Sequence, residues 1–295
     1  MSYSERIFSI DSQKDFEALA LEIFRHQYAQ NKVYQKFCRL LNRDPGQVAS
    51  PEQIPFLPIE FFKSKNLLSS MEPVEITFTS SGTTGSNTSS HLVTDLSVYE
   101  TSFRNGFERF YGDIQDYAIL ALLPSYLERK GSSLIYMVQD LIQCSGNPDS
   151  GFYLQDLEEL QEKLVNLDAA GKKVLLIGVS FALLDLVEKF SFQLKNTVIM
   201  ETGGMKGRRK EMIRAELHSV LSKGFGVEKI HSEYGMTELL SQAYSKGDGI
   251  FECPPWMKIF VRDPEDATAF FPKGRTGGLN IIDLANFNSC SFIAT

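Results

Sequence analysis

The sequence has few of the features that mark several common classes of protein. Its four cysteines, Cys38, Cys144, Cys253 and Cys290, are scattered, and no pair has the spacing of a metal site or of a disulfide framework. This usage fits a reducing cytoplasm, where disulfides are rare. The cysteine pattern therefore excludes a zinc finger and a disulfide-stapled secreted domain.

Long apolar runs and basic clusters are also missing. No window approaches the roughly 18 uninterrupted apolar residues of a transmembrane helix, and residues 1–6 contain no apolar signal core. The 30 basic and 37 acidic residues give a net charge of -7, without a visible Lys/Arg-rich patch. We therefore expect neither a membrane span nor a nucleic acid partner.

What remains is the composition of an ordinary globular protein, with 295 residues of which 43% are hydrophobic and 23% are charged. Residues 11–42 carry apolar side chains at helical spacing behind an N-cap signature at Ser12 to Asp15, and a proline-rich stretch follows at 51–58. These patterns predict an N-terminal helical arm with a connector over residues 1–70.

Residues 71–295 are predicted to form a core of the α/β class. Apolar strand patterns alternate with helical patterns, which indicates mixed sheets flanked by helices, and strands dominate after Trp256. Residues 290–295 look like the middle of a structural element, so we expect the fold to continue beyond Thr295. The predicted strands cover residues 118–123, 174–179, 197–200, 229–234, 258–261 and 278–284. The predicted helices cover residues 131–142, 181–190 and 208–221.

A β-branched run at residues 74–78 leads into a loop of only serine, threonine and glycine. Glycines let a backbone approach a ligand closely, and hydroxyl and N–H donors crowded into a small space suit phosphate oxygens. The loop lacks both the Walker A lysine and the G-x-G-x-x-G spacing of dinucleotide sites. A solvated surface turn is the alternative interpretation. The candidate phosphate-binding residues are Ser80, Ser81, Gly82, Thr83, Thr84 and Gly85.

A second motif, residues 232–238, ends a predicted strand. Tyr234 can stack on a base, Gly235 adds backbone freedom, Thr237 can donate to a phosphate, and Glu238 can hold a Mg²⁺ that bridges phosphate oxygens. A strand–helix turn with a threonine N-cap is the alternative.

A third motif places Gly203 and Gly204 directly after another strand, where two glycines permit close approach to a planar ring. A plain turn is the alternative. Sites in parallel sheets lie at the carboxyl ends of strands, and all three motifs are predicted to lie at such ends. We therefore expect them to converge in one crevice.

These motifs resemble those of the adenylate-forming enzymes, which include acyl-CoA synthetases, luciferases and peptide-synthetase adenylation domains. Residues 79–85 are similar to the T-S-G-T-T-G phosphate loop, and residues 234–238 to the Y-G-x-T-E motif. The chain from about residue 50 to 295 resembles, more narrowly, the LuxE-type acyl-protein synthetases of bacterial bioluminescence. The segments that carry this narrower resemblance are residues 54–59, 125–134, 201–208 and 282–286.

The resemblance implies an adenylate-forming N-terminal core in which ATP and a fatty or other carboxylic acid give acyl-AMP and pyrophosphate. The acyl group would then pass to a cysteine thiol and on to an acyl-CoA reductase-like partner. By the same resemblance, residues 80–85 would hold the β- and γ-phosphates, and the acyl chain would lie near residues 126–133. Gly203 and Gly204 would flank an adenine stacked on Tyr234. Thr237 would contact the α-phosphate and Glu238 would bind Mg²⁺.

Two departures from the family pattern qualify that implication. The phosphate loop continues as residues 86–91 without the usual lysine, so Lys206, Arg208 or Lys210 would have to meet part of the phosphate charge. The chain also ends before the family's ribose-binding aspartate, a downstream arginine and the acyl-accepting cysteine. We expect this chain to bind ATP weakly and not to complete acyl transfer. An acyl- or aryl-CoA ligase and a non-catalytic nucleotide-binding subunit remain open as alternatives.

Three further candidates are weaker. Residues 178–182 loosely resemble the G-x-S-x-G nucleophile elbow, with His218 or His231 as base, but Ala182 replaces the second glycine. We favour a helix N-cap role for Ser180. Cys290 is expected in the core. His91, a lone histidine after the phosphate loop, is expected at the surface rather than on a phosphate.

Overall fold

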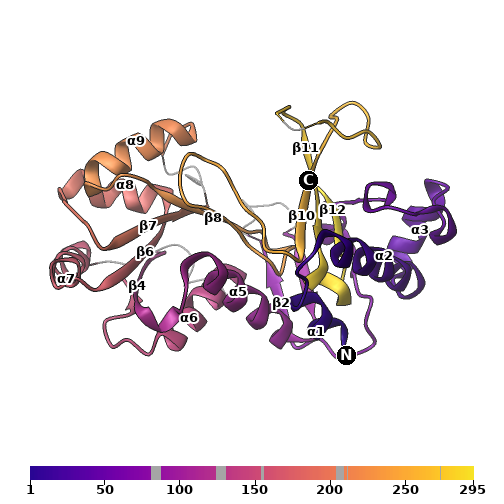
Figure 1. The fold of residues 1–295 in the computed structure, drawn as a ribbon, viewed down its shortest axis with the longest axis horizontal. Helices are drawn as coiled ribbons and strands as arrows, with labels where there is room; N and C mark the ends of the chain where they lie inside the picture. The colour runs from indigo at the N-terminus through magenta and orange to yellow at the C-terminus, as the bar shows by residue number, and fades with distance from the viewer. Residues whose placement is uncertain (81–87, 124–130, 154–155, 204–208, 211, 273) are drawn as a thin grey trace. The chain divides into compact units, whose positions relative to one another are not determined.

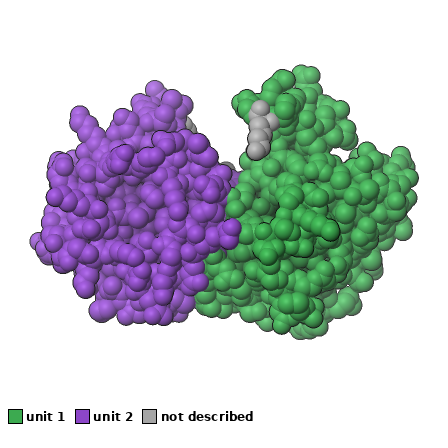
Figure 2. All heavy atoms as spheres, in the orientation of Figure 1, with its two compact units in different colours: residues 1–105, 236–241, 253–295 green, residues 106–235, 242–252 purple. Residues whose placement is uncertain are grey.

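The computed structural model describes residues 1–80, 88–123, 131–153, 156–203, 209–210, 212–272 and 274–295. The chain forms two compact units, which Figure 2 colours separately. Unit 1 comprises residues 1–105, 236–241 and 253–295, and unit 2 comprises residues 106–235 and 242–252. The boundary between an arm and a core at residue 70 stays a prediction.

Unit 2 is built on a six-stranded sheet with the order β5-β4-β6-β7-β8-β9. The first five strands of this order run parallel, and β9 pairs antiparallel at the edge. The predicted alternation of strands and helices is confirmed here. The strands are β4 (Tyr117–Leu122), β5 (Gly151–Phe152), β6 (Lys173–Val179), β7 (Thr197–Thr202), β8 (His231–Tyr234) and β9 (Ala243–Ser245). The helices are η3 (Ile114–Asp116), α6 (Ser133–Ser145), α7 (Leu157–Ala169), α8 (Ser180–Lys189) and α9 (Arg214–Phe225).

The central strands of this sheet are buried on both faces. All of β4 is buried, and so is β6 apart from Lys173, as expected for parallel strands that helices cover on both sides. Figure 1 shows α8 and α9 together on one side of the strands and α6 on the other. The two helices α8 and α9 pack closely because Gly224 leaves room for Val187: a Cβ at residue 224 would lie 2.5 Å from the Val187 Cβ.

Unit 1 contains a four-stranded sheet, β1-β12-β11-β10, and a separate antiparallel pair, β2-β3. The Phe292 ring of β12 stacks on Tyr34 at a centroid distance of 6.0 Å and meets Phe24 edge-on at 6.1 Å, which joins the N-terminal helices to this sheet. Residues 292–294 form a strand between two others. The strands are β1 (Leu57–Pro58), β2 (Ile76–Thr79), β3 (Ser90–Val93), β10 (Met257–Arg262), β11 (Gly278–Asp283) and β12 (Phe292–Ala294). The helical elements are α1 (Tyr3–Phe8), α2 (Gln13–Gln30), α3 (Lys32–Leu40), η1 (Pro45–Gln47), η2 (Pro51–Gln53), α4 (Phe61–Ser64) and η4 (Leu284–Asn288), with α5 (Leu96–Tyr111) divided between the units.

The N-terminal helical segment differs from the prediction of one helix over residues 11–42. Ser12 caps α2 as predicted, by accepting a hydrogen bond from the backbone N–H of Asp15. Asn31, however, has an extended backbone, and its side-chain oxygen accepts hydrogen bonds from the N–H groups of Val33 and Tyr34. An N-cap of this kind begins a new helix, so the segment forms α2 and α3.

The helix predicted at residues 208–221 also begins at a different place. It starts at Arg214 and runs to Phe225, because Ile213 is extended with φ -68° and ψ 147°. Arg209, ahead of it, forms ion pairs with Asp185 and Glu188 on α8 rather than continuing a helix. Residues 208 and 211 lie outside the described part of the chain. Among the helices that the structure describes, none has both the length and the apolar composition that crossing a bilayer would need.

The tight α8–α9 contact leads to a stability prediction. We expect Gly224→Ala to lower the free energy of unfolding by about 1–3 kcal/mol, the usual cost of overpacking. This cost outweighs the roughly 1 kcal/mol that alanine contributes over glycine inside a helix. Urea unfolding followed by circular dichroism measures the change. Gly46→Ala is the control because a Cβ there meets no atom within 4 Å, and equal effects of the two substitutions would contradict the packing argument.

Candidate functional site

Some of the candidate residues lie in unit 1 and some in unit 2, and the others lie outside the described residues. Ser81, Gly82, Thr83, Thr84, Gly85 and Gly204 lie outside the described residues. Ser80, Thr237 and Glu238 are in unit 1, whereas Gly203, Tyr234 and Gly235 are in unit 2.

In unit 2 the structure brings two of the three motifs together. Strands β7 and β8 run parallel as direct neighbours, with Thr202 opposite Glu233. Gly203 therefore follows one strand where Tyr234 ends the next, at the same carboxyl edge of the sheet. The expectation of a parallel-strand end is wrong for the Ser/Thr/Gly loop, because β2 pairs antiparallel with β3 in a separate sheet.

The second motif depends on its glycine. The half-buried Tyr234 ring meets the Phe251 ring edge-on, with centroids 6.1 Å apart. Gly235 is exposed, and a Cβ there would lie 2.6 Å from Oε1 of Glu233. A larger residue at 235 would require the Glu233 carboxyl group to shift, whereas glycine lets the backbone pass close to it.

The Glu233 carboxyl group is buried behind this backbone. Its Oε2 accepts a hydrogen bond from the Thr202 hydroxyl at 2.5 Å. Burial raises the pKa of Glu233 to about 7; the Thr202 hydrogen bond only partly offsets this, and the charge of Glu201 adds to it. Glu233 therefore carries its proton part of the time near neutral pH.

In unit 1, Ser80 closes the stem of the predicted phosphate loop. Its N–H donates to the Ser89 carbonyl at 3.0 Å, and its hydroxyl oxygen accepts from the Ser89 N–H at 2.9 Å. These two hydrogen bonds close the end of the β2–β3 pair that precedes residue 81.

The segment that follows Gly235 is held by the buried carboxylate of Asp283, at the end of β11. Its two oxygens accept hydrogen bonds from the N–H groups of Leu240, Ser241 and Ala285 and from the Ser241 hydroxyl, at 2.6–3.1 Å. Burial raises the pKa of Asp283 to about 6, although these hydrogen bonds lower it. Four donors on one fully buried carboxylate fix the backbone just after Glu238.

Asn286 and His91 hold the same segment from two other directions. The Asn286 amide donates to the Glu238 carbonyl at 2.7 Å and accepts from the Leu240 N–H at 3.1 Å. The His91 ring, on β3, lies with Nδ1 3.0 Å from the Thr237 carbonyl and Nε2 2.8 Å from the Ser289 hydroxyl. Thr237 itself is half-buried, and Glu238 is 5% exposed.

The expectation of a surface position for His91 is therefore wrong. Its ring is fully buried, and burial lowers its pKa to about 4. A neutral ring that faces a carbonyl through Nδ1 must carry its proton there, which leaves Nε2 to accept from Ser289. His91 thus couples the hairpin that bears the Ser/Thr/Gly loop to the backbone of Thr237.

These holding residues were not recognised from the sequence. Asp283 and Asn286 lie in the segment 282–286 that resembles LuxE-type proteins, and that resemblance was their only signal. His91 had no signal beyond its position after the loop.

Ser180 is neither a nucleophile nor the predicted N-cap. Val179 is the N-cap of α8, and Ser180 is its first residue. The Ser180 hydroxyl bonds Glu201 Oε2 at 3.2 Å and the Gly203 carbonyl at 3.1 Å. Of the two candidate bases, His218 contacts Glu201 and Ser232, while His231 contacts Tyr111.

Two of the cysteines, Cys38 and Cys290, are buried in the core, while Cys144 and Cys253 are half-buried. Burial raises the pKa of Cys38 and of Cys290 to about 12, and that of Cys253 to about 11. Thiols with such values stay protonated at neutral pH and are weak nucleophiles. The expected core position of Cys290 is confirmed.

The sequence of this chain is similar to that of a known protein family and to those of curated proteins. The family described as "Acyl-protein synthetase, LuxE" matches residues 4–102. Two long-chain-fatty-acid–luciferin-component ligases align with 98% of this chain and 80% of their own length, at 24% identity in Aliivibrio fischeri and 25% in Vibrio harveyi. The chain is thus similar to LuxE acyl-protein synthetases over residues 4–102, and to the two ligases over almost its whole length.

The fold is that of the N-terminal part of adenylate-forming ligases. A crystal structure of an open conformation of 2-hydroxyisobutyryl-CoA ligase, in complex with 2-HIB-AMP and CoA, superposes with a TM-score of 0.69 at 11% identity. The match covers 95% of this chain but 64% of the ligase chain, so this chain spans somewhat less than two thirds of that structure. At this identity the likeness establishes the fold alone.

The buried His91 leads to a prediction about acid stability. Its native pKa of about 4 lies below the value of about 6.5 expected in the unfolded chain, so the unfolded state takes up the proton first. Stability is therefore lost as the pH falls through this window. His91→Gln keeps a donor and an acceptor but does not titrate. From pH 6.5 to 4 we expect the unaltered chain to lose roughly 3 kcal/mol more than the variant.

Urea unfolding at a series of pH values measures this difference. His231, whose pKa burial also lowers to about 4, is present in both proteins, so its contribution cancels. His26→Gln on α2 is the matched control and should follow the unaltered chain. Parallel pH curves for the unaltered chain and His91→Gln would show that His91 does not resist protonation.

Proposed function

We propose that this chain is an ATP-dependent acyl ligase that converts a fatty or other carboxylic acid to its acyl-adenylate, with release of pyrophosphate. The observation that carries the proposal is the placement of Gly203 beside Tyr234 at one sheet edge, in a fold shared with an adenylate-forming ligase. The names of the relatives, which are fatty-acid ligases, support the substrate class.

The roles of the residues follow from what the reaction requires. A carboxylate that attacks the α-phosphorus of ATP approaches an anion, so the site must neutralise charge and hold the attack in line. Thr237 would donate to the α-phosphate, and residues 80–85 would hold the β- and γ-phosphates. The adenine would lie between the Gly203–Gly204 turn and the Tyr234 ring.

Mg²⁺ would be held by Glu238. This cation is commonly bound by one or two carboxylates together with substrate phosphates, because it keeps several waters and demands octahedral oxygen ligands. The Glu238 backbone is fixed by Asn286, and its side chain is almost fully buried, so a carboxylate is held at a defined place. The cation would neutralise phosphate charge there.

For the second step we propose transfer of the acyl group to a protein cysteine thiol, with an acyl-CoA reductase-like protein as partner. The raised pKa values of Cys38, Cys253 and Cys290 make these three unsuitable acceptors. The second candidate is an acyl- or aryl-CoA ligase, which the superposition on a CoA ligase favours. Formation of an acyl-CoA thioester when CoA is added distinguishes the second candidate from the first.

The proposal predicts the behaviour of a Glu238→Gln variant. We expect pyrophosphate release to depend on both Mg²⁺ and a carboxylic acid, and to fall about 100-fold or more in the variant, because an amide cannot supply the anionic ligand. A coupled pyrophosphate assay across a series of fatty acids of different length measures this.

Glu216→Gln, on the exposed side of α9, is the matched control and should release pyrophosphate at the unaltered rate. Circular dichroism confirms that each variant is folded. Unchanged release by Glu238→Gln would exclude the assigned role of Glu238. ATP binding without release of pyrophosphate with any acid would favour a non-catalytic nucleotide-binding subunit.

A further inference from the structure

The reaction proposed above assigns no role to the Ser180 hydroxyl, yet this buried group hydrogen-bonds two groups on the neighbouring segment. The side chain is 2% exposed, at the point where β6 passes into α8. Its hydroxyl lies 3.1 Å from the carbonyl of Gly203 and 3.2 Å from Oε2 of Glu201, on the neighbouring strand β7. Gly203 is exposed and has a φ of +67°, a conformation that suits glycine.

Glu201 is in turn fixed by side chains that approach its other oxygen. Nε2 of His218 and Nε of Arg214 each lie 3.5 Å from Glu201 Oε1, although its carboxylate is only 5% exposed. Burial raises the pKa of Glu201, but hydrogen bonds from His218 and Ser232 and the charge of Arg214 outweigh this and lower it overall. An ionised carboxylate and a backbone carbonyl both only accept, so the single proton of the Ser180 hydroxyl is shared between Glu201 Oε2 and the Gly203 carbonyl.

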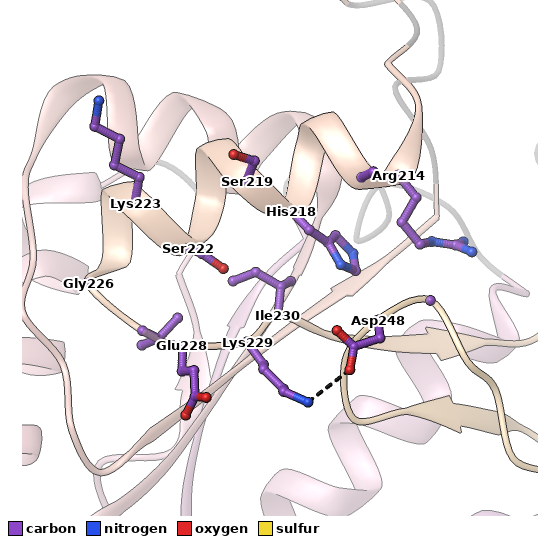
Figure 3. Close-up of a pocket in the computed structure, with 13 residues that line it drawn as sticks. Arg214, His218, Ser219, Ser222, Lys223, Gly226, Glu228, Lys229, Ile230 and Asp248 are labelled. Atoms are coloured by element: carbon purple, nitrogen blue, oxygen red, sulfur yellow. Dashed lines mark hydrogen bonds and ion pairs between the residues drawn. The ribbon is translucent and has the colours of Figure 1, made fainter.

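The two side chains that lie near Oε1 of Glu201, those of Arg214 and His218, come from one helix. Figure 3 shows Arg214 and His218 on α9, beside a cavity of about 920 Å³ whose lining includes none of the described residues assigned to ATP binding. The Arg214 guanidinium also lies 4.8 Å from the centroid of the Phe251 ring, and this ring meets Tyr234 edge-on. The surroundings of Gly203 and of Tyr234 are therefore connected through Arg214.

We propose that Ser180 is a positioning residue for the adenine-binding turn: its hydroxyl holds the Gly203 carbonyl, and the Glu201 carboxylate, set by Arg214 and His218, fixes that hydroxyl. The inference rests on the proposed function, because it takes Gly203 to face the adenine. A turn held by a buried hydroxyl keeps its geometry before the nucleotide arrives, so less ordering is needed on binding.

The test compares two serines that make the same kind of bond. Ser180→Ala removes the hydroxyl that donates to Gly203, and Ser245→Ala removes a buried hydroxyl that donates to Gly247 at 3.0 Å. We expect Ser180→Ala to weaken ATP binding roughly 5- to 10-fold, the effect of one hydrogen bond. The affinity for the carboxylic acid should stay within about twofold, and Ser245→Ala should leave both unchanged. Titration calorimetry with ATP and Mg²⁺ measures the binding.

Hydrogen exchange supplies a readout that does not depend on the nucleotide. The peptide that contains Gly203 should exchange its amide hydrogens faster in Ser180→Ala but not in Ser245→Ala. Each variant is measured at the same interval below its own thermal unfolding midpoint. Unchanged exchange in Ser180→Ala would show that the Ser180 hydroxyl does not hold the Gly203 carbonyl. Faster exchange with unchanged ATP affinity overturns its role in positioning. If the unaltered chain binds no ATP, the proposed function fails and the positioning role fails with it, whereas the exchange result still decides whether Ser180 holds the turn.

Discussion

The backbone of the Thr237–Glu238 segment depends on one buried carboxylate, that of Asp283. An unpaired charge in this position would be strongly destabilising, because burial removes its hydration. Asp283 instead receives four hydrogen bonds, three of them from backbone N–H groups that lie within Leu240, Ser241 and Ala285. The Ser241 hydroxyl is also 3.1 Å from the indole nitrogen of Trp256. The Asp283 carboxylate thus holds residues 236–241, which form neither a helix nor a strand.

Unit 2 uses buried carboxylates in a related way, each placed behind a glycine. Glu201 is linked to Gly203 through Ser180, and Glu233 lies directly beneath Gly235. The glycines are exposed while the acids behind them are buried. The arrangement leaves bare backbone at the sheet edge and keeps the polar support out of water, where its hydrogen bonds are strongest.

The sequence predicted those parts of the molecule whose signals are local. Buried strands such as residues 118–123 and 174–179 are continuous apolar runs, and the glycines at 203 and 235 follow two further predicted strands. The break at Asn31 was missed because an asparagine N-cap inside an apolar helical pattern leaves the periodicity intact. The roles of His91 and Asn286 arise from pairings with Thr237 and Glu238 that are 146 and 48 residues away in the chain, and no local pattern encodes them.

Glu201 on β7 and Glu233 on β8 differ in charge near neutral pH because their neighbours differ. Glu201 has Arg214 and His218 beside it, and its pKa is lowered despite burial. Glu233 accepts a hydrogen bond from the neutral Thr202 hydroxyl, and burial raises its pKa to about 7. Since the native pKa of Glu233 lies above its unfolded value, it reduces stability as the pH rises from about 4.5 to about 7. Near neutral pH Glu233 therefore carries a proton part of the time, whereas Glu201 is the anion. Because the ionised Glu201 and the Gly203 carbonyl both only accept, the Ser180 hydroxyl is the donor that links the two.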